Sequence, residues 1–128
     1  MRSVQRALIV DDNPGFRVSA RLLLEPEGFA VAEADSGAAA VAAAAELHPD
    51  LVLLDVQLPD LDGFAVAEQI ALLEPPPDVI LTSTRDRADY GSLVTAAPAL
   101  GFIAKHDLSA ATIRALRADG RARESAGG

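Results

Sequence analysis

The 128-residue sequence contains no cysteine, which excludes a disulfide framework, a thiolate zinc site and a cysteine nucleophile. No apolar stretch approaches the roughly 20 residues that a membrane-spanning helix needs. The apolar run at residues 7–10, behind a polar N-terminus, is too short for the core of a signal peptide. From these absences we expect a cytoplasmic protein that does not use a membrane as a partner.

Basic residues are also few, because 11 Lys and Arg stand against 19 Asp and Glu, for a formal net charge of -8. Proteins that bind nucleic acid without sequence preference neutralise its phosphates with Lys and Arg. Anionic lipid surfaces attract the same side chains. We therefore expect no nucleic-acid partner and no docking on membranes.

The hydrophobic half of the sequence is arranged in short runs separated by segments of helical periodicity. Strands are predicted at residues 7–10, 29–34, 51–54, 79–81 and 101–104, and helices at 14–25, 37–47, 64–73, 90–97 and 109–118. Strands that alternate with helices pair in parallel. We predict an α/β domain over residues 1–120, a flavodoxin-like doubly wound (βα)5 fold with helices on both faces of a five-stranded parallel sheet. Residues 121–128 are expected to be a disordered tail.

Polar side chains stand at the ends of four of the predicted strands. Asp11 and Asp12 follow the first strand, Asp55 the third, Thr82 the fourth and Lys105 the fifth. Ligands of such open sheets bind outside the carboxyl ends of the strands, where the strand order switches. These five side chains are therefore predicted to meet in one crevice.

The chemistry of that crevice follows from its charges. Three neighbouring carboxylates repel one another unless a cation lies between them. Oxygen ligands without His or Cys favour Mg²⁺ (or Mn²⁺) over zinc. The ammonium of Lys105 adds a second positive charge, so the site is suited to transfer of a phosphoryl group onto the carboxylate of Asp55.

With these features together, the chain resembles the receiver domain of two-component response regulators, from about residue 7 to residue 118. The resemblance rests on four segments in order, each at the end of an apolar run: residues 10–12, 53–63, 81–83 and 101–105. Each segment alone is a weak indication, and the ordered set is specific.

The resemblance implies a role for each matching residue. Asp55 would accept phosphate from a sensor histidine kinase or a small acyl-phosphate donor. Asp12 and Asp55 would bind Mg²⁺ through their carboxylates, Asp11 through a metal-bound water and Gln57 through its backbone carbonyl. Thr82 and Lys105 would contact the phosphoryl oxygens. Thr82 and Phe102 would also act as switch residues, and Phe102 would change rotamer on activation.

The sequence departs from the family pattern after the fifth strand, where His106 stands in place of the usual proline. Residues 84–100 also give little indication of a regular fourth helix. These departures motivate an alternative function, a receiver-like interaction module that phosphorylation does not regulate. Affinity for a partner that stays constant with and without beryllofluoride would favour this alternative.

Simpler explanations exist for individual residues. Asp11, Asp12 and Asn13, which precede Pro14, could simply cap the first helix, since Asp and Asn are good caps. Asp60 and Asp62 are expected to be loop and cap residues. We expect Ser83 to be an ordinary loop hydroxyl.

A metal-dependent phosphatase is disfavoured, because the sequence has no second domain to cover a substrate. We therefore expect that the domain is not an enzyme and that it catalyses only its own phosphorylation and dephosphorylation. The domain is expected to stand alone and to act on an unknown output protein, with a homodimer on phosphorylation left open.

Overall fold

The computed structural model describes residues 4–127, with side chains described up to residue 120, and contains one five-stranded parallel sheet. The strands are β1 (Arg6–Val10), β2 (Ala30–Ala34), β3 (Leu51–Asp55), β4 (Asp78–Ser83) and β5 (Gly101–Ala104). Their spatial order is β2-β1-β3-β4-β5, which confirms the predicted doubly wound topology. The order reverses between β1 and β3, so the switch point lies at the carboxyl ends of these two strands.

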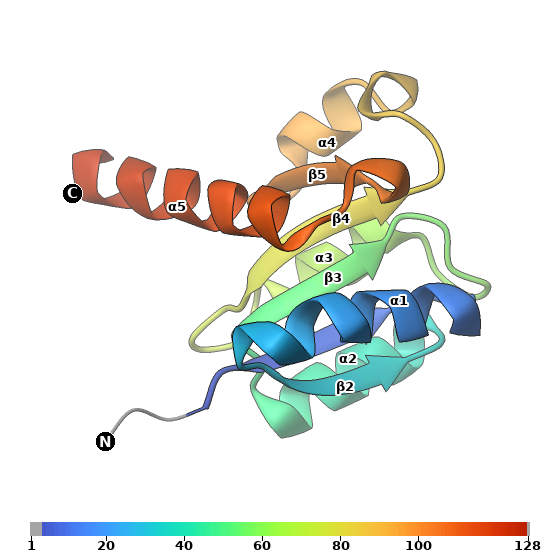
Figure 1. Cartoon of the computed structure of the whole chain (residues 1–128). Coiled ribbons are helices and arrows are strands. Elements are labelled where there is room, and N and C mark those ends of the chain that lie inside the picture. The colour runs from blue at the N-terminus through green and yellow to red at the C-terminus, as the bar shows by residue number, and fades with distance from the viewer. Residues whose placement is uncertain (1–3, 128) are drawn as a thin grey trace.

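Helices cover both faces of this sheet. They are α1 (Pro14–Leu24), α2 (Gly37–Leu47), α3 (Gly63–Ile70), α4 (Ser92–Ala96) and α5 (Ala110–Gly127). Figure 1 shows α1 and α5 on the near face, and α2 and α3 behind the sheet.

The strands form because both of their faces can be buried. Alternate residues of β1 pack on opposite sides: Leu8 and Val10 lie in the core beneath α2 and α3, while Ala7 and Ile9 lie in the core beneath α1 and α5. All five residues of β3 are buried. Continuous apolar runs of this kind are typical of parallel strands covered on both faces.

Side-chain caps define where the main helices begin. The side chain of Asn13 accepts hydrogen bonds from the backbone amides of Gly15 and Phe16 at the start of α1, with Pro14 at the first helical position. Ser36 caps α2 and Asp62 caps α3 in the same way. The first cap is therefore Asn13 itself, which leaves the preceding acidic pair for other contacts.

One predicted boundary is wrong at the C-terminal end of the chain. The last helix was expected to end at residue 118, but the helical backbone of α5 continues to Gly127. Gly120, the last residue of the predicted domain, is buried, and a Cβ there would lie 2.6 Å from Cδ2 of Leu100. The tail predicted for residues 121–128 has no described side chains, and residue 128 lies outside the described residues.

The fourth helix is short, as residues 84–100 indicated. A single 3-10 turn at Arg87–Asp89 precedes the five residues of α4. The third helix ends at Ile70, three residues earlier than expected.

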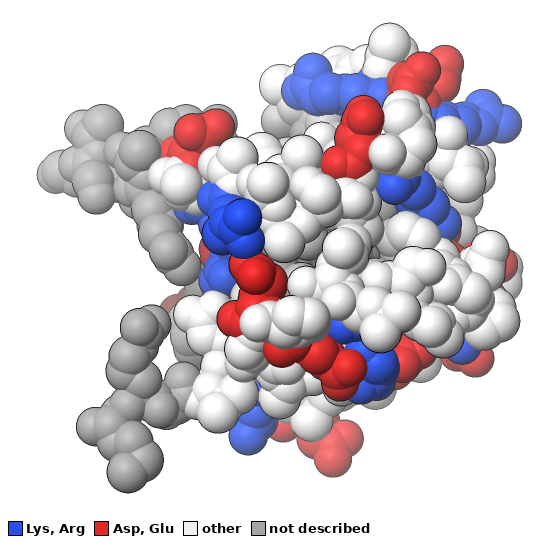
Figure 2. Space-filling view, viewed as in Figure 1, with Lys and Arg blue, Asp and Glu red and all other residues white. Residues whose placement is uncertain are grey.

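The surface carries charge of both signs. On the face drawn in Figure 2, acidic and basic side chains lie beside one another and do not form a basic patch. Within the described part of the chain, no helix combines the length and apolar character needed to cross a membrane.

Candidate functional site

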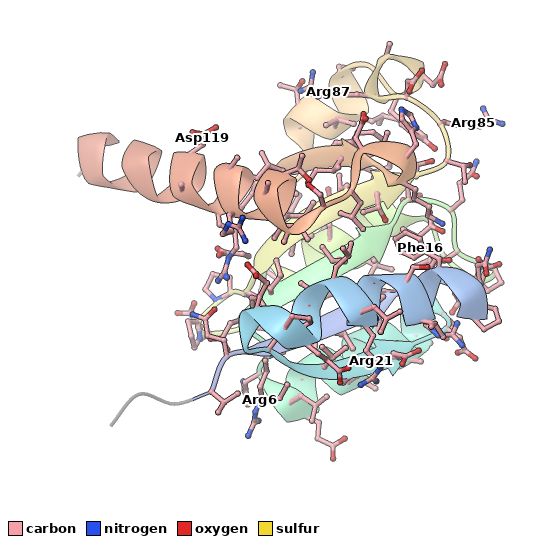
Figure 3. The ribbon with its side chains drawn as sticks, viewed as in Figure 1. Arg6, Phe16, Arg21, Arg85, Arg87 and Asp119 are labelled. Atoms are coloured by element: carbon pink, nitrogen blue, oxygen red, sulfur yellow. The ribbon has the colours of Figure 1, made fainter. Side chains whose placement is uncertain are left out.

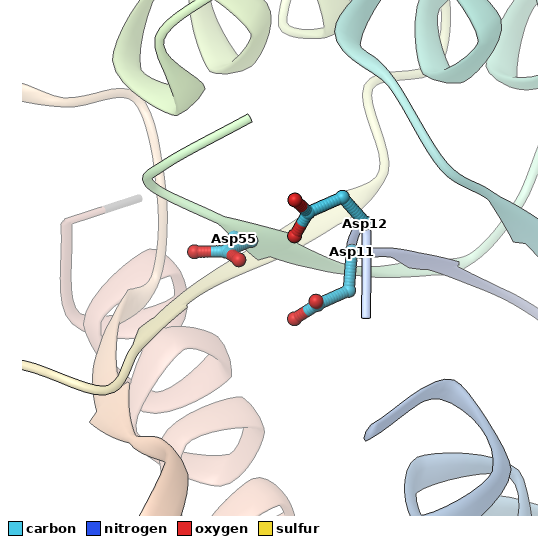
Figure 4. A group of neighbouring side chains, drawn as sticks. All are labelled: Asp11, Asp12 and Asp55. Atoms are coloured by element: carbon cyan, nitrogen blue, oxygen red, sulfur yellow. The ribbon is translucent and has the colours of Figure 1, made fainter. Parts of the chain in front are cut away.

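Three carboxylates meet at the switch point of the sheet. Asp11 and Asp12 follow β1, and Asp55 is the last residue of β3, so the pairing of these two strands brings them together (Figure 4). One carboxylate oxygen from each residue lies within 4.8 Å of those of the other two. The convergence predicted from the strand ends is therefore present for all three acids.

Asp11 is held from several directions and is fully buried, with 0% exposure. Its backbone amide donates to the carbonyl of Ala34 on β2 (3.1 Å), and its Oδ1 accepts from the amide of Asn13 (2.9 Å). Its Oδ2 lies 2.6 Å from Nζ of Lys105. Asp11 is thus a rigid anion whose charge is balanced directly by a lysine.

Asp55 is nearly buried, with 5% exposure, but has fewer partners. Its Oδ1 accepts from the amide of Gln57 at 3.0 Å, and its Oδ2 lies 3.3 Å from Nζ of Lys105. Burial raises the pKa of Asp55 to about 6, and the charge of Asp11 adds to this, while the Gln57 amide and Lys105 oppose it. The carboxylate is therefore incompletely stabilised and suited to accept a further positive charge.

Lys105 follows β5 and bridges the two buried acids, with its side chain 14% exposed. Its Nζ also lies 4.4 Å from the ring centroid of Phe16, a cation–π contact from the first turn of α1. Burial alone would lower the pKa of Lys105, but the hydrogen bond to Asp11 and the charges of Asp55 and Asp11 raise it above its ordinary value. The ammonium therefore stays charged at neutral pH.

The raised pKa of Asp55 predicts a dependence of stability on pH in the metal-free protein. Between the ordinary pKa of 3.8 and the folded value of about 6, the folded protein binds more protons than the unfolded chain, so this group stabilises less as the pH rises. Asp55→Asn removes the buried charge. We compare the free energies of unfolding of Asp55→Asn and the wild type in EDTA. The difference in favour of Asp55→Asn should grow by about 2–3 kcal/mol between pH 4 and pH 7.

Urea denaturation of both proteins at the two pH values measures this difference. Asp119→Asn, on the exposed side of α5 (Figure 3), is the matched control and should show no such growth. An Asp55→Asn advantage that does not change with pH would contradict the assignment.

Thr82 and Ser83 end β4 next to the acids, and both are fully buried. The Thr82 hydroxyl has no hydrogen-bond partner among the described residues. The expectation for Ser83 is wrong: its hydroxyl is buried, accepts from the amide of Arg85 (3.1 Å) and shares a hydrogen bond with the hydroxyl of Tyr90 (2.7 Å). Residue 83 still belongs to the strand, which carries its side chain inward.

Phe102, on β5, is half-buried and packs against Tyr90, with ring centroids 5.8 Å apart. Tyr90 also contacts Phe64 edge-on at 5.8 Å. The three rings and Ser83 therefore connect α3, β5 and the end of β4 to the turn that precedes α4.

The loop between β3 and α3 is fixed at both ends. The carboxylate of Asp60 accepts from the amides of Gly37 (2.7 Å) and Ala38 (3.0 Å) at the start of α2, and Asp62 caps α3. Both residues are cap residues, as expected. Gly63 approaches the carbonyl oxygen of Asp55 so closely that a Cβ would lie 2.3 Å from it. These contacts fix the backbone around Gln57.

Two residues at the rim are exposed. The carboxylate of Asp12 makes no hydrogen bond or ion pair within the described residues, so it is free to bind a ligand. His106 lies in a 3-10 turn at Lys105–Asp107, with its side chain 62% exposed and its Nε2 3.4 Å from Asp107. With His106 in place of the usual proline, Lys105 still lies in the site.

Two residues near the site were not predicted from the sequence: Phe16, which contacts Lys105, and Tyr90, which contacts Ser83 and Phe102. The helical spacing of the segments that contain them gave no indication of contacts with strand ends.

Comparisons with known proteins agree with this geometry. A family model described as the response regulator receiver domain matches residues 7–116. The DNA-binding response regulator MtrA of Mycolicibacterium smegmatis is 40% identical over 85 residues, which cover 66% of this chain and 37% of that protein. A protein-glutamate methylesterase/protein-glutamine glutaminase of Agrobacterium fabrum is 37% identical over 95 residues, which cover 73% of this chain and 27% of that protein.

A solved structure with the same fold is a CheY-like response regulator receiver domain protein from Methanospirillum hungatei JF-1. It has a TM-score of 0.81 and 25% sequence identity, and the match covers 98% of this chain and 100% of that chain. The chain spans less than two thirds of the length of the curated relatives described above. The family match over most of the sequence, the five-stranded fold and the acidic cluster lead to one conclusion: this chain belongs to the response-regulator receiver domain family of two-component signalling.

Proposed function

We propose that this receiver domain accepts a phosphoryl group on Asp55 in a Mg²⁺-dependent transfer. The observation that carries the proposal is the position of Asp55, which shares one ammonium with Asp11 and lies beside the free carboxylate of Asp12. The donor would be a sensor histidine kinase or a small acyl phosphate.

The residues fit a hard divalent cation. Three carboxylates carry three negative charges, and Lys105 balances only one of them. Mg²⁺ prefers oxygen ligands and keeps several waters. Asp12 and Asp55 would hold the cation directly, Asp11 through a water, and Gln57 through its backbone carbonyl. When bound, Mg²⁺ supplies positive charge that offsets the charge on the phosphoryl oxygens.

The chain's own groups carry the transfer. A carboxylate oxygen of Asp55 attacks phosphorus, and a new O–P bond forms as the N–P bond of the phosphohistidine breaks. The electron pair of that bond returns to the imidazole nitrogen, which takes a proton from solvent. With an acyl phosphate, an O–P bond breaks and a carboxylate leaves. Lys105 would stabilise the phosphoryl oxygens, since preorganised charge of this kind lowers such barriers.

The buried hydroxyl of Thr82 supports a switch. A phosphoryl group adds about -1.5 to -2 charge and new acceptor oxygens. The Thr82 hydroxyl, which has no hydrogen-bond partner in the described part of the chain, would donate to one of these oxygens. Movement of Thr82 would open space beside Phe102, whose rotamer change would pass the event to an output protein.

The setting of this switch is also a proposal. We expect a cytoplasmic protein that receives its phosphoryl group from a sensor kinase and whose output partner is unknown. A homodimer formed on phosphorylation is a further expectation. MtrA binds DNA according to its name. The face of this chain drawn in Figure 2 shows no basic patch on its described surface.

Incubation with acetyl phosphate and Mg²⁺, followed by intact-protein mass spectrometry, tests the proposal. The wild type should gain one phosphoryl group, while Asp55→Asn and the wild type in EDTA should gain none. Asp119→Asn should behave as the wild type. Equal labelling of wild type and Asp55→Asn would remove Asp55 from this role.

A further inference from the structure

Arg17, in the first turns of α1, is attached to the acidic site through the protein backbone. Its Nη1 donates to the carbonyl oxygen of Asp11 at 2.6 Å. That carbonyl belongs to the peptide group joining Asp11 to Asp12. The guanidinium therefore contacts the segment carrying two of the three carboxylates, without touching any carboxylate of the cluster.

The same guanidinium is fixed at its other edge. Nε of Arg17 donates to Oε1 of Glu33 on β2 at 2.8 Å, and the Arg17 side chain is only 18% exposed. The planar guanidinium presents its donors in a rigid fork. Glu33 and the Asp11 carbonyl thus hold it between an edge strand and the loop after β1.

We propose that Arg17 is a positioning residue for the cation site. It fixes the peptide group between Asp11 and Asp12 and so keeps the Asp12 carboxylate directed toward Asp55. This inference rests on the proposed function, because it concerns the same site. The Asp11 side chain holds the peptide group that follows Asp12, through the amide of Asn13, and Arg17 holds the peptide group that precedes it. The Asp12 carboxylate itself has no hydrogen bond or ion pair within the described residues, so its direction depends on these two peptide groups.

Arg21 provides a matched control one helical turn later. It also pairs with Glu33, at 2.8 Å and 3.0 Å, and with Glu25 at 3.1 Å, but it has no contact with Asp11. Figure 3 shows Arg21 farther along α1, away from the end of the helix where Phe16 lies. Arg17→Met and Arg21→Met each remove one positive charge and the contacts of that arginine with Glu33. Only Arg17→Met also removes the hydrogen bond to the Asp11 carbonyl.

The two possible effects of Arg17 on metal binding have opposite signs. Removing a positive charge near an anionic site favours cation binding through the field alone. Releasing a group that orients a ligand weakens binding, typically by about 10–100-fold for residues behind the ligands. The sign of the change therefore separates positioning from a simple charge effect.

Titration with Mn²⁺, with free Mn²⁺ measured by electron paramagnetic resonance, tests the proposal on the whole chain. We expect Arg17→Met to raise the Kd by about tenfold or more. Arg21→Met should leave the Kd unchanged or slightly lowered. Arg17→Lys keeps the charge but cannot bridge both partners, so it should also weaken binding, and it serves if Arg17→Met does not fold.

The outcomes separate the two proposals. If the wild type binds Mn²⁺ and Asp12→Asn weakens binding, but the Arg17 variants bind as tightly as the wild type, the positioning role is wrong and the proposed function remains. Equal weakening by the Arg17 and Arg21 variants would also overturn it, since loss of the Glu33 contacts would then explain the effect. No binding by the wild type would overturn the proposed function itself.

Discussion

Asp12→Asn is expected to weaken Mg²⁺ binding by at least about tenfold. A unit charge about 4 Å from a cation contributes about 4 kcal/mol per unit of cation charge at the effective dielectric near a protein surface, and the replacing water recovers part of this. Asp12 is exposed and makes no described contact, so its substitution should leave the free energy of unfolding in EDTA nearly unchanged. The expected effect is therefore on binding alone.

Isothermal titration with Mg²⁺ measures the affinity of Asp12→Asn, and urea denaturation in EDTA measures its stability. Asp119→Asn removes the same charge on α5, away from the three acids, and should bind Mg²⁺ as the wild type does. Unchanged Mg²⁺ affinity in Asp12→Asn would show that this carboxylate is not a ligand.

Lys105→Met is expected to reduce the rate of phosphorylation by acetyl phosphate about a hundredfold, the usual cost of removing one preorganised charged donor. The same substitution leaves Asp11 and Asp55 buried without their shared cation. Breaking a buried ion pair costs about 3 kcal/mol, although protonation of Asp55 would relieve part of this. Metal-free protein should therefore be clearly less stable.

Initial rates from mass spectrometry and urea denaturation in EDTA measure the two effects of Lys105→Met. Saturating Mg²⁺ should restore more stability to this variant than to the wild type, because the cation replaces the missing charge. Lys105→Arg, which keeps the charge, should lose less of the phosphorylation rate and less of the stability than Lys105→Met. A wild-type rate in Lys105→Met would contradict the role of this lysine in the transfer.

The strand ends were predictable because parallel strands direct their last residues to one edge of the sheet. Each apolar run of the sequence ends at a polar residue, and that single pattern identified Asp11, Asp55, Thr82 and Lys105. The buried runs and the helical periodicity between them identified the (βα)5 order in the same way.

Contacts between elements distant in sequence could not be predicted from local patterns. Arg17 is 16 residues from Glu33, and Phe16 reaches Lys105 across the sheet edge. Ser83 was misjudged because strand β4 extends two residues beyond its expected end and turns the hydroxyl toward Tyr90. The composition of the tail likewise does not indicate that the helical backbone of α5 continues to Gly127.

Chemical trapping of the modified residue tests the central claim most directly. Borohydride reduces an aspartyl phosphate to homoserine, which peptide mass spectrometry locates in the sequence. After treatment with acetyl phosphate and Mg²⁺, homoserine should replace aspartate at position 55 and nowhere else, and none should form in EDTA. Homoserine at another acidic residue, or formation that does not depend on the divalent cation, would contradict the account.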